Sequence, residues 1–253
     1  MAPDPCADCP HAAKLRATAA CDPDDVCVLA SSGRRIDRFF RAHPVLAADY
    51  LGDDFWERRA IAARYAPLEL VRPLARDPDE VVRRIVASRL SPGEAAGLMR
   101  DPDREVRITV AQRIDHDGLL QMAGDPDYMV RVVVARRLSH GKLPRLSQDP
   151  EREVRKTVAR RLPAFALTRL LGDPEPEVRR IVAARALPHD ALLLLADEDW
   201  LVRLSAVQRA PLDAIRDCLT DPESEVRRAA WERLAAGKDD KQSMTENADE
   251  SMG

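Results

Sequence analysis

The chain has 253 residues, 45% of them hydrophobic and only 4% aromatic, and its formal net charge at pH 7 is −3. This apolar fraction is enough for one or two domains with an aliphatic core. No apolar run approaches the about 18 residues of a membrane span, and no charged-then-apolar signal opens the chain, so a membrane or secreted protein is excluded and a cytoplasmic one expected.

Four cysteines lie close together at the N-terminal end. Cys6, Cys9, Cys21 and Cys27 have the spacing C-x2-C-x11-C-x5-C. In a cytoplasmic protein such a group is expected to bind metal rather than to form disulfides, although unligated or disulfide-bonded thiols stay open. Four thiolates can hold a tetrahedral zinc ion or a [4Fe–4S] cluster. The loose C-x5-C differs from the short paired knuckles of zinc sites, which favours the cluster, and residues 1–33 are predicted as a metal-binding segment.

The next segment, residues 34–52, is predicted to cap the repeats that follow it. It holds several large apolar residues without the regular spacing of the later chain: Ile36, Phe39, Phe40, Leu46 and Leu51. The terminal unit of a repeat protein must be covered, because its apolar face has no neighbouring repeat. A metal group beside this cap can therefore be structural, and it can also serve electron transfer or redox sensing.

One phrase restarts every 24 residues through most of the chain. It begins at Asp77, Asp101, Asp125, Asp149, Asp173, Asp197 and Asp221, and a degenerate copy begins at Asp53. The shared pattern is Asp-Pro-acid-x-x-Val-Arg-x-x-Val-Ala-x-Arg-Leu. A strict period of this length predicts stacked repeats in which each unit buries its apolar face against the next. We expect eight units over residues 53–236.

Each unit is predicted to contain a helix followed by a shorter element. Asp followed by Pro is typical of an N-cap and a first helical residue, so a helix is expected to start near every such Pro. Val82, Val86 and Leu90 share one helix face beside the small Ala87. Roughly nine residues remain for the second element, a short helix or 3₁₀ turn that completes the core. Its core column contains Leu98, Met122, Leu146, Leu170, Leu194 and Cys218.

Two family resemblances follow from these columns. The Asp-x5-Arg spacing with Val before Arg resembles the ladder of HEAT repeats, which implies Asp–Arg pairs between adjacent units, but HEAT units are longer, at about 40 residues. The 24-residue unit more closely resembles the leucine-rich repeat variant family. That resemblance implies an all-α, right-handed superhelical solenoid of alternating α- and 3₁₀-helices. It also implies an N-terminal [4Fe–4S] cluster, with Cys6, Cys9, Cys21 and Cys27 as its ligands.

Two columns of arginines run through the repeats. The first lies six residues after each Asp and is predicted to form the Asp–Arg ladder. The second lies near each helix C-terminus, where a cation complements the helix dipole, and could form a line of guanidiniums. Residues 125–172 carry 11 basic and 5 acidic groups, a net charge of +6. The candidate basic patch there consists of Arg136, Arg137, Lys142, Arg145, Arg152, Lys156, Arg160, Arg161 and Arg169.

An acidic protein segment or a nucleic acid could bind this patch, or it could remain solvated. Acidic flanks and the lack of aromatic residues for base stacking weigh against nucleic acid. No phosphate-binding glycine phrase or zinc-hydrolase His pair is present, so no enzyme and no small-molecule substrate is predicted. Residues 237–253 are predicted as a disordered acidic tail.

The function favoured by the sequence is a protein-interaction module with an iron–sulfur cluster, which can have an electron-transfer or redox-sensing role. The alternatives are a nucleic-acid-binding solenoid modulated by its cluster and a scaffold with a structural zinc.

Overall fold

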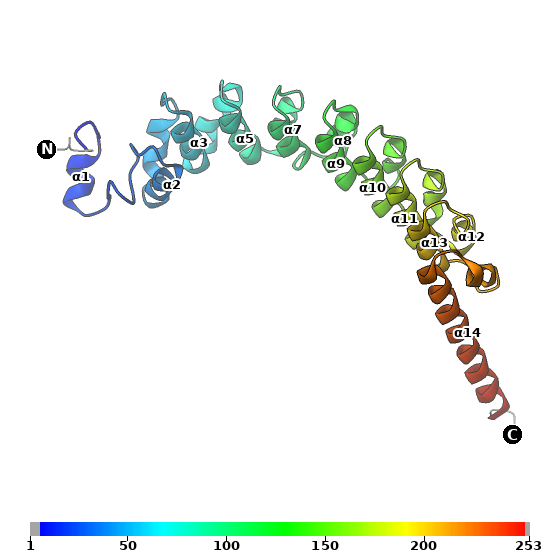
Figure 1. Ribbon diagram of the computed structural model, residues 1–253. Coiled ribbons are helices and arrows are strands. Elements are labelled where there is room, and N and C mark those ends of the chain that lie inside the picture. Colours follow the sequence, from blue (N-terminus) through cyan, green and yellow to red (C-terminus); the bar gives the residue numbers. More distant parts are fainter. Residues whose placement is uncertain (1–5, 251–253) are drawn as a thin grey trace. The chain divides into compact units, whose positions relative to one another are not determined.

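The computed structural model describes residues 6–250, with side chains described through residue 237. Throughout this part every regular element is helical, and the extended pairing is limited to an isolated antiparallel bridge between Asp22 and Val26. The chain divides into two compact units, Met1–Met122 and Ala123–Gly253 (Figure 1). None of the described helices combines the length and apolar composition that crossing a bilayer requires.

The first unit contains the cysteine segment, the cap and the first repeats. Its elements in chain order are α1 (Ala12–Ala17), α2 (Gly33–Ala42), η1 (Pro44–Tyr50), α3 (Trp56–Tyr65), α4 (Leu68–Val71), η2 (Arg72–Arg76), α5 (Glu80–Arg89), α6 (Pro92–Ala95), η3 (Ala96–Leu98), α7 (Arg104–Ala111) and α8 (His116–Gln121). Helices α3, α5 and α7 are the main helices of successive repeats, and each packs on the next.

The second unit repeats the same alternation. Its elements are α9 (Tyr128–Arg137), η5 (Leu143–Leu146), α10 (Arg152–Arg161), η6 (Ala164–Leu170), α11 (Pro176–Arg185), α12 (Pro188–Leu192), α13 (Trp200–Val207), η7 (Ala214–Thr220) and α14 (Ser224–Glu250), while η4 (Met122–Gly124) spans the boundary between the units. The predicted alternation of an α-helix with a short helix or 3₁₀ turn is therefore confirmed. The predicted acidic tail, 237–253, lies almost entirely outside the residues whose side chains are described, and it stays a prediction.

The predicted helix start is wrong by two residues. The N-cap of α5 is Asp79, whose side chain accepts hydrogen bonds from the backbone N–H groups of Val81 and Val82. Asp77 lies before the helix, and its Oδ1 accepts the N–H of Asp79 at 2.9 Å across Pro78. This is an Asx turn, in which an aspartate bonds its own backbone two residues on. The first acid of the phrase therefore shapes the loop, and the second caps the helix.

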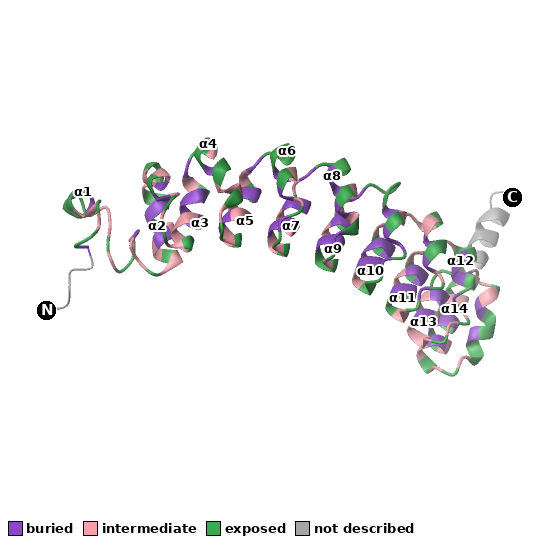
Figure 2. Cartoon of the chain, turned by 90° about the horizontal axis from the view of Figure 1, so that it is seen from above, coloured by how far each residue is buried: buried purple, intermediate pink, exposed green. Residues whose placement is uncertain are grey.

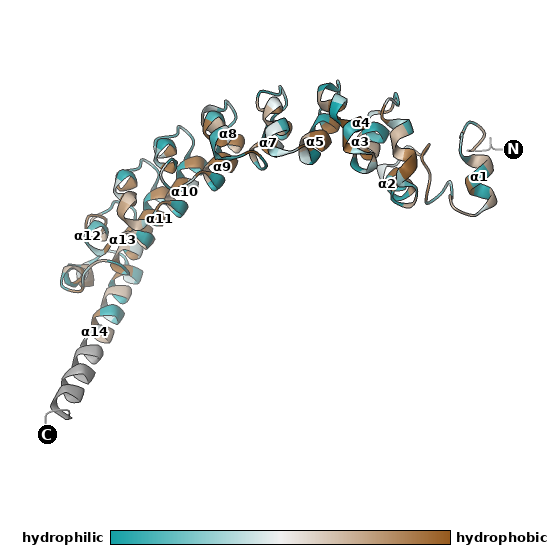
Figure 3. Cartoon of the chain, turned by 180° about the vertical axis from the view of Figure 1, so that it is seen from behind, coloured by the Kyte–Doolittle hydropathy of each residue, from teal (hydrophilic) through white to brown (hydrophobic). Residues whose placement is uncertain are grey.

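The predicted core columns are buried. Val82, Val86 and Ala87 have no exposed surface, and Leu90 is 4% exposed. The column of the second element is buried in the same way: Leu98, Met122, Leu146, Leu170, Leu194 and Cys218. Buried segments lie along α9, α10 and α11 in Figure 2, and apolar and polar residues alternate along the same helices in Figure 3. Each repeat thus buries aliphatic side chains between its main helix and its short element.

The first arginine column forms the predicted ladder. Arg83 donates from Nε and Nη2 to the two carboxylate oxygens of Asp101, at 2.8 and 2.9 Å. Its Nη1 donates to the backbone carbonyls of Asp77 and Pro78, at 2.9 and 3.0 Å. Each of these ladder arginines therefore fixes the loop of its own repeat and binds the aspartate of the next. The other described pairs are Arg59–Asp77, Arg131–Asp149, Arg155–Asp173, Arg179–Asp197 and Arg203–Asp221.

Electrostatics agrees with this ladder geometry. The hydrogen bond that Arg155 donates to Asp173 raises the pKa of the guanidinium above its usual value, despite its burial. Likewise, the hydrogen bond from Arg203 holds the pKa of Asp221 below its usual value. The charged forms of Arg155 and Asp221 are thus stabilised, as expected of groups in bidentate pairs.

The second arginine column caps helices rather than forming an exposed line. Nη1 of Arg161 donates to the carbonyls of Ala135 and Leu138, at 2.8 and 2.6 Å. These carbonyls belong to the C-terminal end of α9, in the preceding repeat. The expected interaction with a helix C-terminus is present, but it joins neighbouring repeats. Arginines with the same role are Arg89, Arg113, Arg185, Arg209 and Arg233.

The predicted cap is packed on the first repeat. In α2, Ile36, Phe39 and Phe40 are at most 1% exposed, and in η1, Tyr50 is 7% exposed. The rings of Phe40 and Tyr50 meet edge to face, with centroids 5.4 Å apart. Both α2 and η1 pack against α3. This aromatic group takes the place that a preceding repeat has elsewhere.

Candidate metal centre and basic surface

A helix end positions the third cysteine of the N-terminal segment. The N–H of Ala20 donates to the Leu15 carbonyl at 2.8 Å, and the N–H of Ala19 donates to the Arg16 carbonyl at 3.1 Å. These two bonds form a Schellman motif at the end of α1. The motif turns the chain directly before Cys21.

The cysteine segment is tied to the cap and to the first repeat. The ring nitrogen Nε2 of His43 lies 2.8 Å from the Ala20 carbonyl, beside Cys21. Next to Cys27, the Val28 carbonyl accepts a hydrogen bond from Nε of Arg58 at 2.8 Å. Residues of α2 and α3 therefore hold both loops that carry the third and fourth cysteines.

The four cysteines lie close enough to influence one another electrostatically. Cys6 is 6% exposed, and Cys9, Cys21 and Cys27 are half-buried. Burial raises the pKa of Cys21, and the nearby Cys6, Cys9 and Cys27 raise it further. Among the described residues no group of three or more His, Cys, Asp or Glu side chains lies within metal-binding distance of one another. Four neighbouring thiols with no disulfide between them fit the donor set of a [4Fe–4S] cluster.

One residue of this segment has a strained backbone. Ala19 has φ 52°, in the left-handed region that favours glycine. We expect Ala19→Gly to remove the steric cost of about 1–2 kcal/mol and to lose about 0.4–1 kcal/mol through a more flexible unfolded chain. The net result is a stabilisation of about 0–1.6 kcal/mol, measurable by urea unfolding and by slower iron loss to a chelator.

The matched control for this change is Ala17→Gly. That alanine lies within α1, so a glycine there should destabilise by about 1 kcal/mol. Equal effects of the two substitutions would contradict the proposed strain at Ala19.

The candidate basic patch does not form one surface. Arg137 and Arg161 belong to the second arginine column, and Arg161 already donates to two backbone carbonyls. Lys156 pairs with Glu153 at 3.0 Å and with Glu177 at 2.6 Å. Arg152 lies 3.9 Å from Glu153. Acidic neighbours therefore offset two of the predicted cations.

The other members of the patch are exposed on two different layers. Arg136 and Arg160 lie at the C-terminal ends of α9 and α10. Lys142, Arg145 and Arg169 lie at or within the short elements η5 and η6. The sequence could not show that these residues lie on two layers, because spacing along the chain does not distinguish the two layers of a repeat. Ligand binding by either group stays a prediction.

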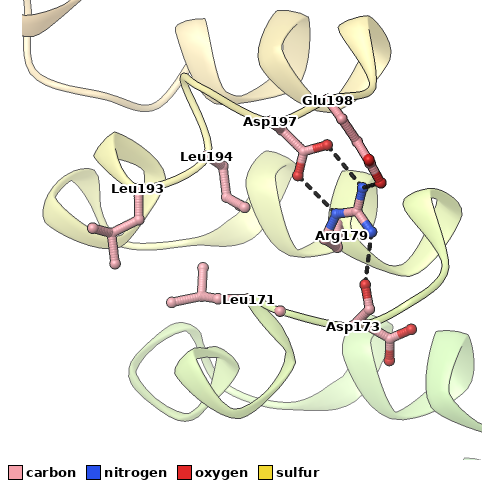
Figure 4. Close-up of a pocket in the computed structure, with 8 residues that line it drawn as sticks. Leu171, Asp173, Arg179, Leu193, Leu194, Asp197 and Glu198 are labelled. Atoms are coloured by element: carbon pink, nitrogen blue, oxygen red, sulfur yellow. Dashed lines mark hydrogen bonds and ion pairs between the residues drawn. The ribbon is translucent and has the colours of Figure 1, made fainter.

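A groove between two repeats exposes part of the ladder, but the N–H groups of its arginine are already used within the protein. One groove of about 380 Å³ is lined by Leu193, Asp197, Glu198 and the ladder residue Arg179 (Figure 4). Arg179 donates to both oxygens of Asp197, to Glu198 at 3.2 Å, and through Nη1 to two backbone carbonyls. Every N–H of the guanidinium is occupied, so this groove is not suited to an anion.

The fold and the cysteine segment define an all-helical repeat protein with a thiol group ahead of its repeats. The family model described as "LRV protein FeS4 cluster" matches residues 3–49, and the model "Leucine rich repeat variant" matches residues 152–175. A solved structure titled "A leucine-rich repeat variant with a novel repetitive protein structural motif" is 54% identical. The alignment covers 90% of this chain and 98% of that one, with a TM-score of 0.87.

The chain therefore belongs to the leucine-rich repeat variant family, and its N-terminal segment is the family's iron–sulfur region, which holds a [4Fe–4S] cluster. The predicted family, fold class and cofactor are confirmed. No match was found among curated proteins. In this segment Cys6, Cys9, Cys21 and Cys27 would hold the cluster, which supplies one-electron redox chemistry when bound.

Proposed function

We propose that this protein is a cytoplasmic protein-interaction module, with a binding rather than a catalytic role, whose cluster exchanges electrons or senses redox state. The observation that carries the interaction role is the C-terminal end of the second unit. In the earlier repeats of the unit, the following repeat covers the corresponding side chains. In the last repeat these side chains are at least partly exposed.

Trp231 is the first of these side chains. It occupies the column in which Ala183 and Val207 have no exposed surface, yet it is 65% exposed. Earlier repeats need a small residue there because the next main helix packs on it. A large exposed indole at the end of a stack is typical of an interface, where tryptophan is enriched.

Arg227 is the second side chain that the last repeat leaves partly exposed to a partner. Its Nη1 donates to the carbonyls of Asp221 and Pro222, at 2.5 and 2.8 Å, as in the other ladder arginines. Those arginines also bind an aspartate 18 residues later in the chain, but the residue at that distance from Arg227 is Thr245. Among the described side chains, no carboxylate bonds Nε or Nη2 of Arg227. The end repeat therefore offers an indole beside a guanidinium.

These two groups favour a partner protein that supplies a carboxylate for Arg227 and an apolar surface for Trp231. A second copy of this chain cannot continue the stack with its first repeat, because α2 and η1 already cover that repeat.

A photo-crosslinking experiment tests the docking surface. With a photoreactive residue at position 231, we expect one discrete protein adduct in cells that produce this protein, and its loss on Arg227→Glu. The matched controls are Arg228→Glu, an exposed neighbour outside the ladder, and a photoreactive residue at the exposed Leu219. An adduct that survives Arg227→Glu, or that forms equally at position 219, would contradict the proposed surface.

The redox role is supported by the exposure of the site. Cys9, Cys21 and Cys27 are only half-buried, so a cluster on these thiols lies where a partner's redox centre can approach it. An anaerobic potentiometric titration monitored by electron paramagnetic resonance should show a reversible one-electron couple. A cluster that is not reduced reversibly would instead indicate a structural role, whatever the crosslinking result.

A further inference from the structure

The cap contains a buried hydroxyl with no acceptor. Tyr50 is 7% exposed, and its Oη has no hydrogen-bond partner in the described part of the chain. Leaving such a donor unsatisfied lowers the stability of the folded state. Phenylalanine would fill the same place beside Phe40 without this cost, so packing alone does not explain the hydroxyl.

The surroundings of Tyr50 lead to the cysteine group. Burial and then the nearby Cys9 raise the pKa of Tyr50 to about 12, so the hydroxyl keeps its proton and can act as a donor. On the same side, the ring of His11 lies 5.8 Å from that of Tyr50, centroid to centroid. Nε2 of His11 is also buried without a partner. Two unsatisfied polar atoms thus belong to neighbouring rings, one of them two residues after Cys9 and the other within the electrostatic influence of that thiol.

Other polar rings in or next to the cap have partners. The hydroxyl of Tyr65, in α3, donates to Oδ1 of Asp37 at 2.9 Å. Nε2 of His43 lies 2.8 Å from the Ala20 carbonyl. Among the described polar rings of the cap and of the cysteine segment, the buried atoms without a partner therefore belong to Tyr50 and His11.

We propose that the Tyr50 hydroxyl, together with the Nε2–H tautomer of His11, donates hydrogen bonds to sulfur atoms of the cluster. The proposal rests on the four cysteines holding that cluster. Both residues are positioning residues, because they act on the cluster's orientation and electronic state. A donor to sulfur stabilises the more negative, reduced cluster and thereby raises its reduction potential. The same bonds connect the cluster to the aromatic cap of the repeats.

Tyr50→Phe tests this in the cluster-loaded protein. At a fixed solution potential we expect the ratio of reduced to oxidised cluster to fall about tenfold, equivalent to about 59 mV for one electron. A coupling from an exchangeable proton, measured by electron–nuclear double resonance of the reduced protein in H₂O and D₂O, should disappear. Tyr65→Phe is the matched control, since it removes a hydroxyl that has its own partner, and should change neither readout.

The potential and the proton coupling both decide the outcome. If Tyr50→Phe binds a full cluster with the potential and proton coupling of the wild type, the proposal is wrong. If the variant assembles no cluster, the proton coupling of the wild-type cluster alone tests the proposal. Absence of any exchangeable proton coupled to its reduced cluster would overturn the proposal, and its presence together with cluster loss in the variant supports it.

Discussion

Arg155→Ala should lower the free energy of unfolding of the second unit by about 3–5 kcal/mol, the cost of removing one partner of a buried ion pair. Arg155 lies in the middle of the described ladder, with its Nε 2.7 Å and its Nη2 2.9 Å from the oxygens of Asp173. Asp173 is 6% exposed, so its carboxylate would stay buried without its main counter-ion.

The arginine also holds its own loop. Its Nη1 donates to the carbonyls of Asp149 and Pro150, at 2.8 and 3.1 Å, and alanine leaves both without this donor. The loss therefore affects two consecutive repeats. Since each repeat of a solenoid is stabilised mainly by its neighbours, we expect one weakened interface to reduce the cooperativity of unfolding as well.

Lys156→Ala is the matched control, one residue further along the same helix. Lys156 also makes two ion pairs, but its partners Glu153 and Glu177 are substantially exposed. Exposed pairs contribute little, so the expected change is within about 1 kcal/mol. Urea unfolding followed by circular dichroism measures both variants. Equal losses would show that the ladder contributes no more than a surface ion pair.

The period and the ladder could be predicted from the sequence because each repeat needs the same residues. Val82, Val86 and the ladder arginine Arg83 contact neighbouring repeats, so their columns stay nearly invariant within the chain. The helix start could not be predicted in the same way. Asp77 and Asp79 are both acids beside a proline, and only the position of the preceding repeat's arginine assigns one to the ladder and the other to the cap.

The basic patch and the cap also have features that could not be predicted from the sequence. The sequence places Arg136 and Arg137 side by side, but one is exposed and the other half-buried, because neighbouring residues of a helix point in different directions. In the cap, Tyr50 lies one period before Leu74 and two before Leu98, in the core column of the second element, so its position predicts an apolar side chain and gives no sign of a role for the hydroxyl. The significance of the hydroxyl depends on its proximity to the cysteine segment, and the repeat pattern of the sequence does not show that proximity.

Cys9→Ser should abolish nearly all cluster binding in the full-length protein. Serine offers a poor ligand for iron, and a cluster with three remaining thiolates loses a quarter of its protein ligands. After anaerobic purification we expect iron to fall from about four atoms per chain to nearly none, with loss of the broad absorbance near about 400 nm. Cys218→Ala is the matched control, because that thiol is buried in the repeat core and should leave the iron content unchanged.

The melting behaviour of the first unit then separates two roles of the cluster. The loop that carries Cys21 is fixed to the cap by His43, and the loop that carries Cys27 is fixed to the first repeat by Arg58. If the cluster is needed to cover the end of the repeats, its loss should lower the melting temperature of the first unit, since an uncovered terminal repeat exposes its apolar face. An unchanged melting temperature would mean that α2 and η1 cap the repeats by themselves, and that the cluster is retained for its redox chemistry.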